Sequence, residues 1–126
     1  IMSERNKKQF GIWMDSHQAI IVGRENLETG NFVVIASEKN AGDTGNSNEN
    51  ASNNNERKLQ QVFFKEISAH MQNIDELHVT GTGQVQEQFI RYMAETPQYK
   101  NTIAKHSTSN KMSGDKLVEF IDAKFK

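Results

Sequence analysis

Short apolar runs separated by turn residues fill the first third of the chain. The runs cover residues 9–14, 19–22 and 32–36, and each is rich in Ile, Val, Phe or Trp. Residues 15–18 and 28–30 lie between them and contain Asp, Ser or Gly, which favour tight turns. The pattern predicts three strands, and because their connections are short we expect an antiparallel meander.

A polar tract then interrupts this pattern. Residues 40–55 are dominated by Asn, Gly, Ser and Glu and include no large apolar side chain. Such a segment cannot bury enough apolar surface to offset the entropy lost on ordering. We therefore predict a flexible polar loop at about 38–55, which is either a plain insertion or a loop that contacts a partner.

Helical periodicity begins after this tract and alternates with two further strands. Apolar residues about four apart predict a long helix, a second helix that Pro97 closes, and a third that Ser113 and Asp115 begin. Residues 77–80 and 102–106 are the intervening strands. The three helical stripes are Leu59, Phe63, Ile67 and Met71, then Val85, Phe89 and Met93, then Leu117, Ile121 and Phe125.

These elements predict one α/β domain that spans residues 1–126. Their order is strand, strand, strand, helix, strand, helix, strand, helix, with the polar loop before the first helix. A meander followed by alternating helices and strands implies a mixed, mainly antiparallel five-stranded sheet with helices packed on it. A chain of 126 residues is long enough for one hydrophobic core and too short for two.

Composition narrows the classes of function. Fifteen basic and sixteen acidic residues give a net charge of -1, so no global field draws the chain to nucleic acid, although a local basic patch is compatible with this total. The absence of cysteine excludes disulfides and thiolate chemistry and fits a reducing compartment. No stretch approaches the roughly 20 apolar residues that span a bilayer. The N-terminus lacks the apolar run of a signal peptide, so we expect a cytoplasmic protein with no membrane partner.

The later elements carry a resemblance to a known family. Residues 77–89 form an apolar strand, a Gly-x-Gly turn and a helix that leads quickly to Phe89, and residues 106–117 form a strand and a Gly-containing helix start. This arrangement resembles the middle domain of archaeal and eukaryotic class-one peptide-chain release factors and of Pelota, and its bacterial relatives. The resemblance implies a ribonuclease-H-like layout found in translation components, with the ribosome or tRNA as partner.

One departure from that family limits what the resemblance implies. The family's release factors have Gly-Gly-Gln in the loop before the long helix, and this motif promotes peptidyl-tRNA hydrolysis. The corresponding tract here contains no glutamine, and its nearest feature is Thr44-Gly45-Asn46. Catalytic placement of a water depends on sub-ångström geometry, so asparagine is no safe substitute. We expect no hydrolase activity, and we retain Thr44, Gly45 and Asn46 as candidate loop contacts.

Gly81, Thr82 and Gly83 form the first candidate binding site. Glycines after a strand and before a helix allow backbone N–H groups to approach a phosphate or an RNA backbone at the positive end of the helix. The segment is neither a Walker loop nor a full dinucleotide fingerprint. The alternative is a tight turn in which the glycines satisfy backbone geometry alone.

Asp15 is the second candidate. Ribonuclease-H-like nucleases hold divalent metals on a carboxylate of the first strand, and two-metal chemistry needs several such groups. Asp15 ends the first strand and Glu66 lies on the first helix, but no second ligand pair is visible. An aspartate beside Ser16 in a hairpin is also a common turn former.

The remaining chemistry-bearing residues are isolated. The four histidines lack the spacing of metal ligands, and His78 is expected on the strand face opposite Leu77 and Val79. Trp13 is expected either to pack beneath a helix or to offer a stacking surface for RNA bases.

The residues and the resemblance together favour a non-catalytic module associated with the ribosome or tRNA, which needs no cofactor. One alternative is a metal-dependent nuclease that uses Asp15. Another is a homo-oligomeric domain for protein interaction.

Overall fold

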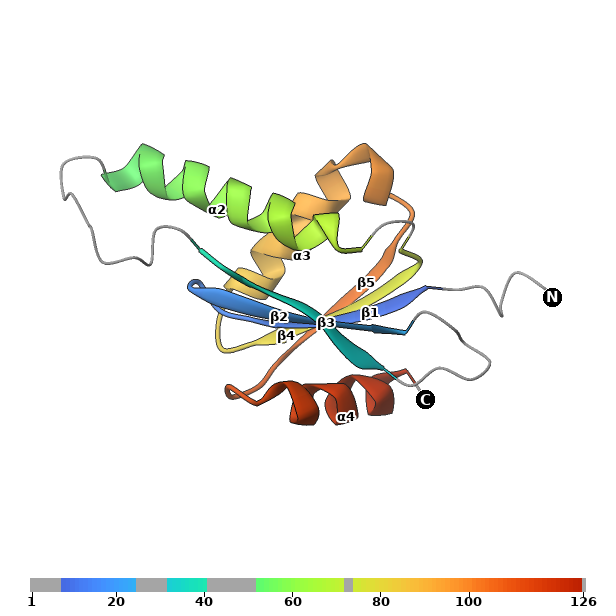
Figure 1. The fold of residues 1–126 in the computed structure, drawn as a ribbon. Coiled ribbons are helices and arrows are strands. Elements are labelled where there is room, and N and C mark those ends of the chain that lie inside the picture. The colour runs from blue at the N-terminus through green and yellow to red at the C-terminus, as the bar shows by residue number, and fades with distance from the viewer. Residues whose placement is uncertain (1–7, 25–31, 41–51, 72–73, 126) are drawn as a thin grey trace.

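A mixed five-stranded sheet lies at the centre of the structure, with helices on both of its faces (Figure 1). The computed structural model describes residues 8–24, 32–40, 52–71 and 74–125. The strands are, in chain order, β1 (Gln9–Met14), β2 (Gln18–Arg24), β3 (Val33–Lys39), β4 (Glu76–Gly81) and β5 (Ile103–Thr108). The helices are α2 (Ser52–Ala69), α3 (Val85–Glu95), the short 3-10 turn η3 (Pro97–Tyr99) and α4 (Gly114–Lys124).

The strand order across the sheet is β3-β2-β1-β4-β5. β1 pairs with β2, and β2 with β3, in antiparallel fashion, whereas β4 runs parallel to both β1 and β5. The predicted element order and the mixed five-stranded sheet are confirmed. The pairings are evenly split rather than mainly antiparallel, because α2 and α3 act as crossovers that return the chain to the same end of the sheet.

The larger core lies between the sheet and the layer formed by α2 and α3. Alternate residues of β1 and β4 point into it, as the period of two in a strand requires. Phe64 of α2 and Phe89 of α3 meet edge to face at a ring separation of 5.2 Å. Each fully buried side chain of this size contributes about 1.5–3 kcal/mol. The members of this cluster from β1, β4 and the two helices include Phe10, Ile12, Met14, Leu77, Val79, Phe63, Phe64, Ile67, Phe89 and Met93.

A smaller core on the opposite face of the sheet holds α4 against β1 and β2. Trp13 is fully buried there with Leu117 and Ile121, and its indole N–H donates to the carbonyl oxygen of Asn110 at 3.1 Å. Gly11 allows this close packing, because a Cβ at that position would lie 2.3 Å from the Ile121 side chain. The prediction that Trp13 packs beneath a helix is confirmed.

Both ends of the predicted polar loop belong to regular elements, so the loop is shorter than 38–55. Glu38 and Lys39 pair with β2, because β3 is an edge strand on which polar side chains remain solvated. α2 begins at Ser52, since a helix that is anchored by a buried stripe extends at little cost per residue. Its first turns project past the end of the strands (Figure 1). The remainder of the predicted loop, 41–51, lies outside the described residues.

α4 lies mainly over β1, β2 and β3. On the same face His78 and Thr80 of β4 are buried, whereas Ile103 and Lys105 of β5 are exposed. Ser113 caps this helix as predicted, because its hydroxyl accepts the Lys116 backbone N–H at 3.3 Å. Within the described residues, every helix falls short of the length and apolar content that a membrane span needs.

Candidate functional site

The predicted Gly81–Thr82–Gly83 turn joins the end of β4 to the start of α3. A Cβ on Gly81 would lie 2.1 Å from the carbonyl oxygen of Met14, so close approach of β4 to β1 requires glycine here. A Cβ on Gly83 would meet no atom within 4 Å, and both Thr82 and Gly83 are exposed. The turn therefore presents exposed backbone at the positive end of a helix, which is a geometry suited to anions. A phosphate-binding role for it stays a prediction.

Gln86 secures this turn from inside the protein. Its side-chain amide donates to the carbonyl oxygens of Gly81 at 3.3 Å and Ser107 at 3.0 Å, and the residue is almost fully buried. The contacts link the start of α3 to the ends of both β4 and β5. Sequence reasoning did not single out Gln86, because a glutamine in the first turn of a helix is usually solvated.

Asp15 is engaged by its own turn. Its Oδ1 accepts the backbone N–H groups of His17 and Gln18, both at 2.8 Å, as a turn-forming aspartate does. Glu66 is exposed on α2. Among the residues that the structure describes, no three His, Asp or Glu side chains gather closely enough to hold a metal ion.

The loop candidates Thr44, Gly45 and Asn46 lie outside the described residues. The elements that flank them are tied together, because His70, which follows α2, lies 2.6 Å from the carboxylate of Glu38 in β3.

A polar network joins β4 and β5 on the face of the sheet that carries α4. His78 Nε2 and the Ser107 hydroxyl lie 2.8 Å apart, Ser107 and Thr80 hydroxyls lie 3.0 Å apart, and Thr80 and Ser109 hydroxyls lie 2.8 Å apart. The two strands are in register, with His78 opposite Lys105 and Thr80 opposite Ser107. The alternation of strand residues places all of these side chains on one face.

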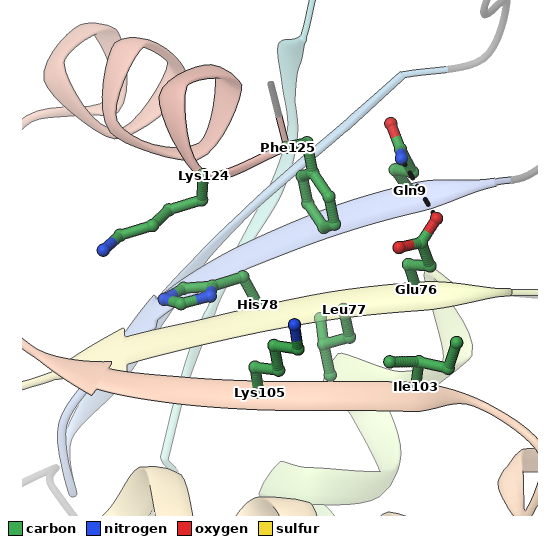
Figure 2. A pocket seen from close by; sticks show the side chains of 8 residues that line it. All are labelled: Gln9, Glu76, Leu77, His78, Ile103, Lys105, Lys124 and Phe125. Carbon is green, nitrogen blue, oxygen red and sulfur yellow. Dashed lines mark hydrogen bonds between the residues drawn. The ribbon is translucent and has the colours of Figure 1, made fainter.

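A pocket of about 270 Å³ opens beside this network. Its lining comes from the sheet and from the C-terminal end of α4, and Figure 2 shows Lys124 and Lys105 on either side of His78. Phe125 lies over the middle of the pocket, and Gln9 donates to Glu76 at its other end at 3.2 Å. The lining includes Glu76, His78, Ile103, Lys105, Lys124 and Phe125.

The environment of His78 is hydrophobic and electropositive. Burial, which is the largest cause, and the positive charges of Lys124, His106 and Lys105 together lower the pKa of His78 to about 4. The ammonium of Lys124 lies 5.2 Å from the Phe120 ring, which in turn lies 6.1 Å from the His78 ring. His78 is therefore neutral at pH 7.

The contact between His78 and Ser107 has part of the geometry of a nucleophile and its base. A general base works best when its pKa is near the working pH, and the pKa of His78 lies well below 7. The pair is therefore better suited to hydrogen bonding than to proton abstraction.

The structure confirms that His78 lies on the face opposite Leu77 and Val79. Sequence reasoning did not identify Thr80, Ser107 or Ser109 as its partners. The available signal was the alternation of hydroxyls at 107 and 109, which places both on one strand face, but the neighbouring strand cannot be known from a single sequence.

Comparison with known proteins gives a likeness of fold. No protein-family model matches the chain, and no curated protein matches it. Among solved structures, Pelota of Thermoplasma acidophilum matches with a TM-score of 0.62 and 15% identity over 94% of this chain. Pelota of Archaeoglobus fulgidus matches with a TM-score of 0.59 and 16% identity over 98% of the chain. An archaeal translation termination factor, aRF1, matches with a TM-score of 0.59 and 14% identity over 90%.

The chain covers 33% of each of these three proteins, about a third of their length. At such identities the likeness establishes the fold. It confirms the resemblance that residues 77–89 and 106–117 indicated: this chain has the α/β fold of a domain shared by Pelota and a translation termination factor.

Proposed function

We propose that this chain is a non-catalytic module of the release-factor-middle-domain type that associates with the ribosome or tRNA in the cytoplasm. The observation that carries the proposal is the likeness of fold, which extends over 90% or more of the chain to Pelota proteins and a translation termination factor. Because this fold accounts for 90% or more of the chain, we assign the proposed binding to it.

Three features support the absence of catalysis in this proposal. The residues between β3 and α2 contain no glutamine, so the hydrolytic motif of the family has no counterpart. Asp15 is occupied by the amides of its own turn. His78 is too weak a base at neutral pH to activate Ser107.

Within this proposal, the Gly81–Thr82–Gly83 turn is the contact for RNA phosphates, and Thr44, Gly45 and Asn46 form a second contact from the polar loop. The turn offers exposed backbone at the N-terminal end of α3. Glu87, in the first turn of α3, repels an anion at the turn, so this contact alone binds RNA weakly. A second contact from the loop raises the overall affinity.

The test is co-sedimentation of the purified chain with ribosomes of its own host at increasing salt. We expect the pelleted fraction to fall as salt rises, because phosphate contacts release counterions. Gly83→Glu places a negative charge at the turn and should reduce pelleting. Gln98→Glu adds the same charge at the exposed η3 turn beyond the other end of α3 and serves as the matched control.

A variant in which residues 41–50 are replaced by a short Gly-Ser linker tests the loop contact. Reduced pelleting of this variant supports a role for the loop. Failure of the wild-type chain to pellet with ribosomes at low salt overturns the proposal.

The edge strand β3 favours self-association as a second candidate function. Val33, Val34 and Ile35 are 54%, 47% and 38% exposed, and β3 is an outer strand of the sheet that the described residues form. An apolar edge strand is a template for pairing with another chain. If copies of the chain pair here, Val34→Lys abolishes a dimer seen by light scattering. Val62→Lys, at an equally exposed position on α2, leaves the dimer intact.

A further inference from the structure

The pocket lies on the face of the sheet that carries α4, and its lining comes from β1, β4, β5 and the C-terminal end of α4. α4 lies mainly over β1, β2 and β3, so its C-terminal end forms one wall of the pocket. His78 of β4 and Lys105 of β5 form the floor (Figure 2). The volume of about 270 Å³ is close to the lower limit of small-ligand pockets, roughly 300 Å³.

Two cations from different elements converge on His78. Lys105 lies directly across the strand pair from it, and Lys124 lies over the Phe120 ring that contacts it. Both lysines act on His78 electrostatically, as does His106 of β5. The partial negative charge at the C-terminal end of α4 is offset by Lys124. Glu76 lies at the opposite end of the pocket, where Gln9 binds it.

The hydroxyl network sets the neutral tautomer of His78. The Ser107 hydroxyl donates to the Thr80 hydroxyl at 3.0 Å, so toward His78 it accepts. The ring proton of neutral His78 therefore lies on Nε2, and Nδ1 is unprotonated. Protonation of Nδ1 makes it a donor for an anion in the pocket.

The other part of the pocket is apolar and aromatic. Phe125 overhangs it, and Ile103 is 53% exposed at its edge. An aromatic face beside an amide and a carboxylate, those of Gln9 and Glu76, suits a planar heterocycle with polar edges. Lysines bind a phosphate group as point charges, and two of them match its double charge.

We propose that this pocket binds a nucleotide, with its phosphate between Lys105 and Lys124 above His78 and its base against Phe125. The phosphate comes either from a free mononucleotide or from a single-stranded nucleic acid. The inference does not rest on the proposed ribosome association, because it concerns the isolated chain and a small ligand.

The experiment follows the imidazole resonances of His78 by NMR as inorganic phosphate, AMP, adenosine and a short oligoadenylate are added at constant ionic strength. We expect inorganic phosphate and AMP to shift these resonances and to raise the pKa of His78 from about 4, because a bound anion stabilises the protonated ring. AMP should bind more tightly than inorganic phosphate, because its base adds the contact with Phe125.

Lys105→Ala and Lys124→Ala should each weaken AMP binding about fivefold, the factor expected for one charge at contact distance in a solvated pocket. Lys65→Ala removes the same charge from the exposed surface of α2, in the layer on the opposite side of the sheet, and should leave AMP binding unchanged. Lys105→Arg keeps the charge and should restore most of the affinity. Each variant's amide spectrum reports whether the fold is intact.

The four probes distinguish the sources of the phosphate. Tighter binding of oligoadenylate than of AMP indicates a nucleic-acid strand, whereas equal or weaker binding indicates a free nucleotide, and either result supports the site. The proposal is overturned if neither phosphate nor AMP shifts His78 at tens of millimolar. Binding of adenosine as tight as that of AMP, or equal losses in Lys65→Ala and Lys105→Ala, also overturns it.

Discussion

Substitution of Gly81 by alanine isolates the structural role of the β4–α3 turn. The added Cβ would lie 2.1 Å from the Met14 carbonyl oxygen and 3.0 Å from Gln86 Oε1. The Met14 carbonyl oxygen belongs to the backbone of the central strand β1, so it cannot rotate away as a side chain can. To relieve the clash, the end of β4 must move away from β1 at Met14 and Gly81, the last residue pair of these two parallel strands.

The expected net loss of stability is about 1–3.5 kcal/mol. Overpacking that displaces backbone costs about 1–3 kcal/mol, and weakening a ladder hydrogen bond or the Gln86 contact to the Gly81 carbonyl costs about 1 kcal/mol more. Alanine also lowers the conformational entropy of the unfolded chain, which offsets about 0.4–1 kcal/mol of this cost. For a chain of this length we expect a fall in Tm of about 4–13 °C.

Gly83→Ala is the matched control, two residues further along the same turn. Its Cβ would enter open space, and its φ lies outside the left-handed region. The only remaining effect is that alanine lowers the conformational entropy of the unfolded chain. The stability of this variant should therefore be unchanged or higher by about 0.4–1 kcal/mol. Urea denaturation followed by circular dichroism measures both variants against the wild type.

The reasoning fails if Gly81→Ala melts within about 2 °C of the wild type, since that is less than 1 kcal/mol at this chain length. It also fails if the two alanine variants lose equal stability, because the close approach would then not distinguish the positions.

Substitutions at three further positions test the face of the sheet that carries α4 and the β1–β2 hairpin. Because the pKa of His78 lies near 4, below its ordinary 6.5, the unfolded chain takes up the proton first as pH falls. The free energy of unfolding should therefore fall by at most about 3 kcal/mol between pH 6.5 and pH 4 because of His78. Urea denaturation at several pH values should show that this part of the pH dependence is absent in His78→Gln. Trp13→Phe leaves the Asn110 carbonyl unpaired and a small cavity, so it should cost about 1.5–3 kcal/mol by the same denaturation assay. Asp15→Ala should cost about 1–2 kcal/mol in thermal unfolding, and Asp15→Asn clearly less, because asparagine retains an acceptor for the turn amides.

Local patterns in the chain predicted most of the architecture. The periods of two and of about four identified every strand and α-helix in the described ranges, because each of these elements must turn one face to a core. The 3-10 turn η3 was not predicted. The strand face of Trp13 left two possibilities, packing beneath a helix or an exposed stacking surface, and the structure shows the first. Element ends were less predictable: β3 continues to Lys39 and α2 begins at Ser52, since tertiary pairing and helix propagation both tolerate polar residues.

The pocket could not be predicted, because it depends on which strands become neighbours. His78 and Ser107 are 29 positions apart and meet only because β5 lies beside β4. Lys124 reaches the same place only because α4 covers part of one face. In a sequence, serine, threonine and lysine on strands and helix ends look like ordinary surface residues. Their grouping into a pocket becomes visible only when the order of the strands and the position of α4 are known. Sequence reasoning instead favoured glycines and an aspartate, whose roles can be inferred locally.

The central position of β1 has a consequence for how the protein is made. The ribosome synthesises β1 and its antiparallel neighbour β2 early, but Gln9 of β1 pairs with Glu76 of β4, which is 67 positions later in the chain. Contacts between residues so far apart in sequence form late in folding. A nascent chain that stops after Lys39 therefore has an unpaired apolar strand edge on both sides of its meander, and such a fragment should aggregate rather than fold.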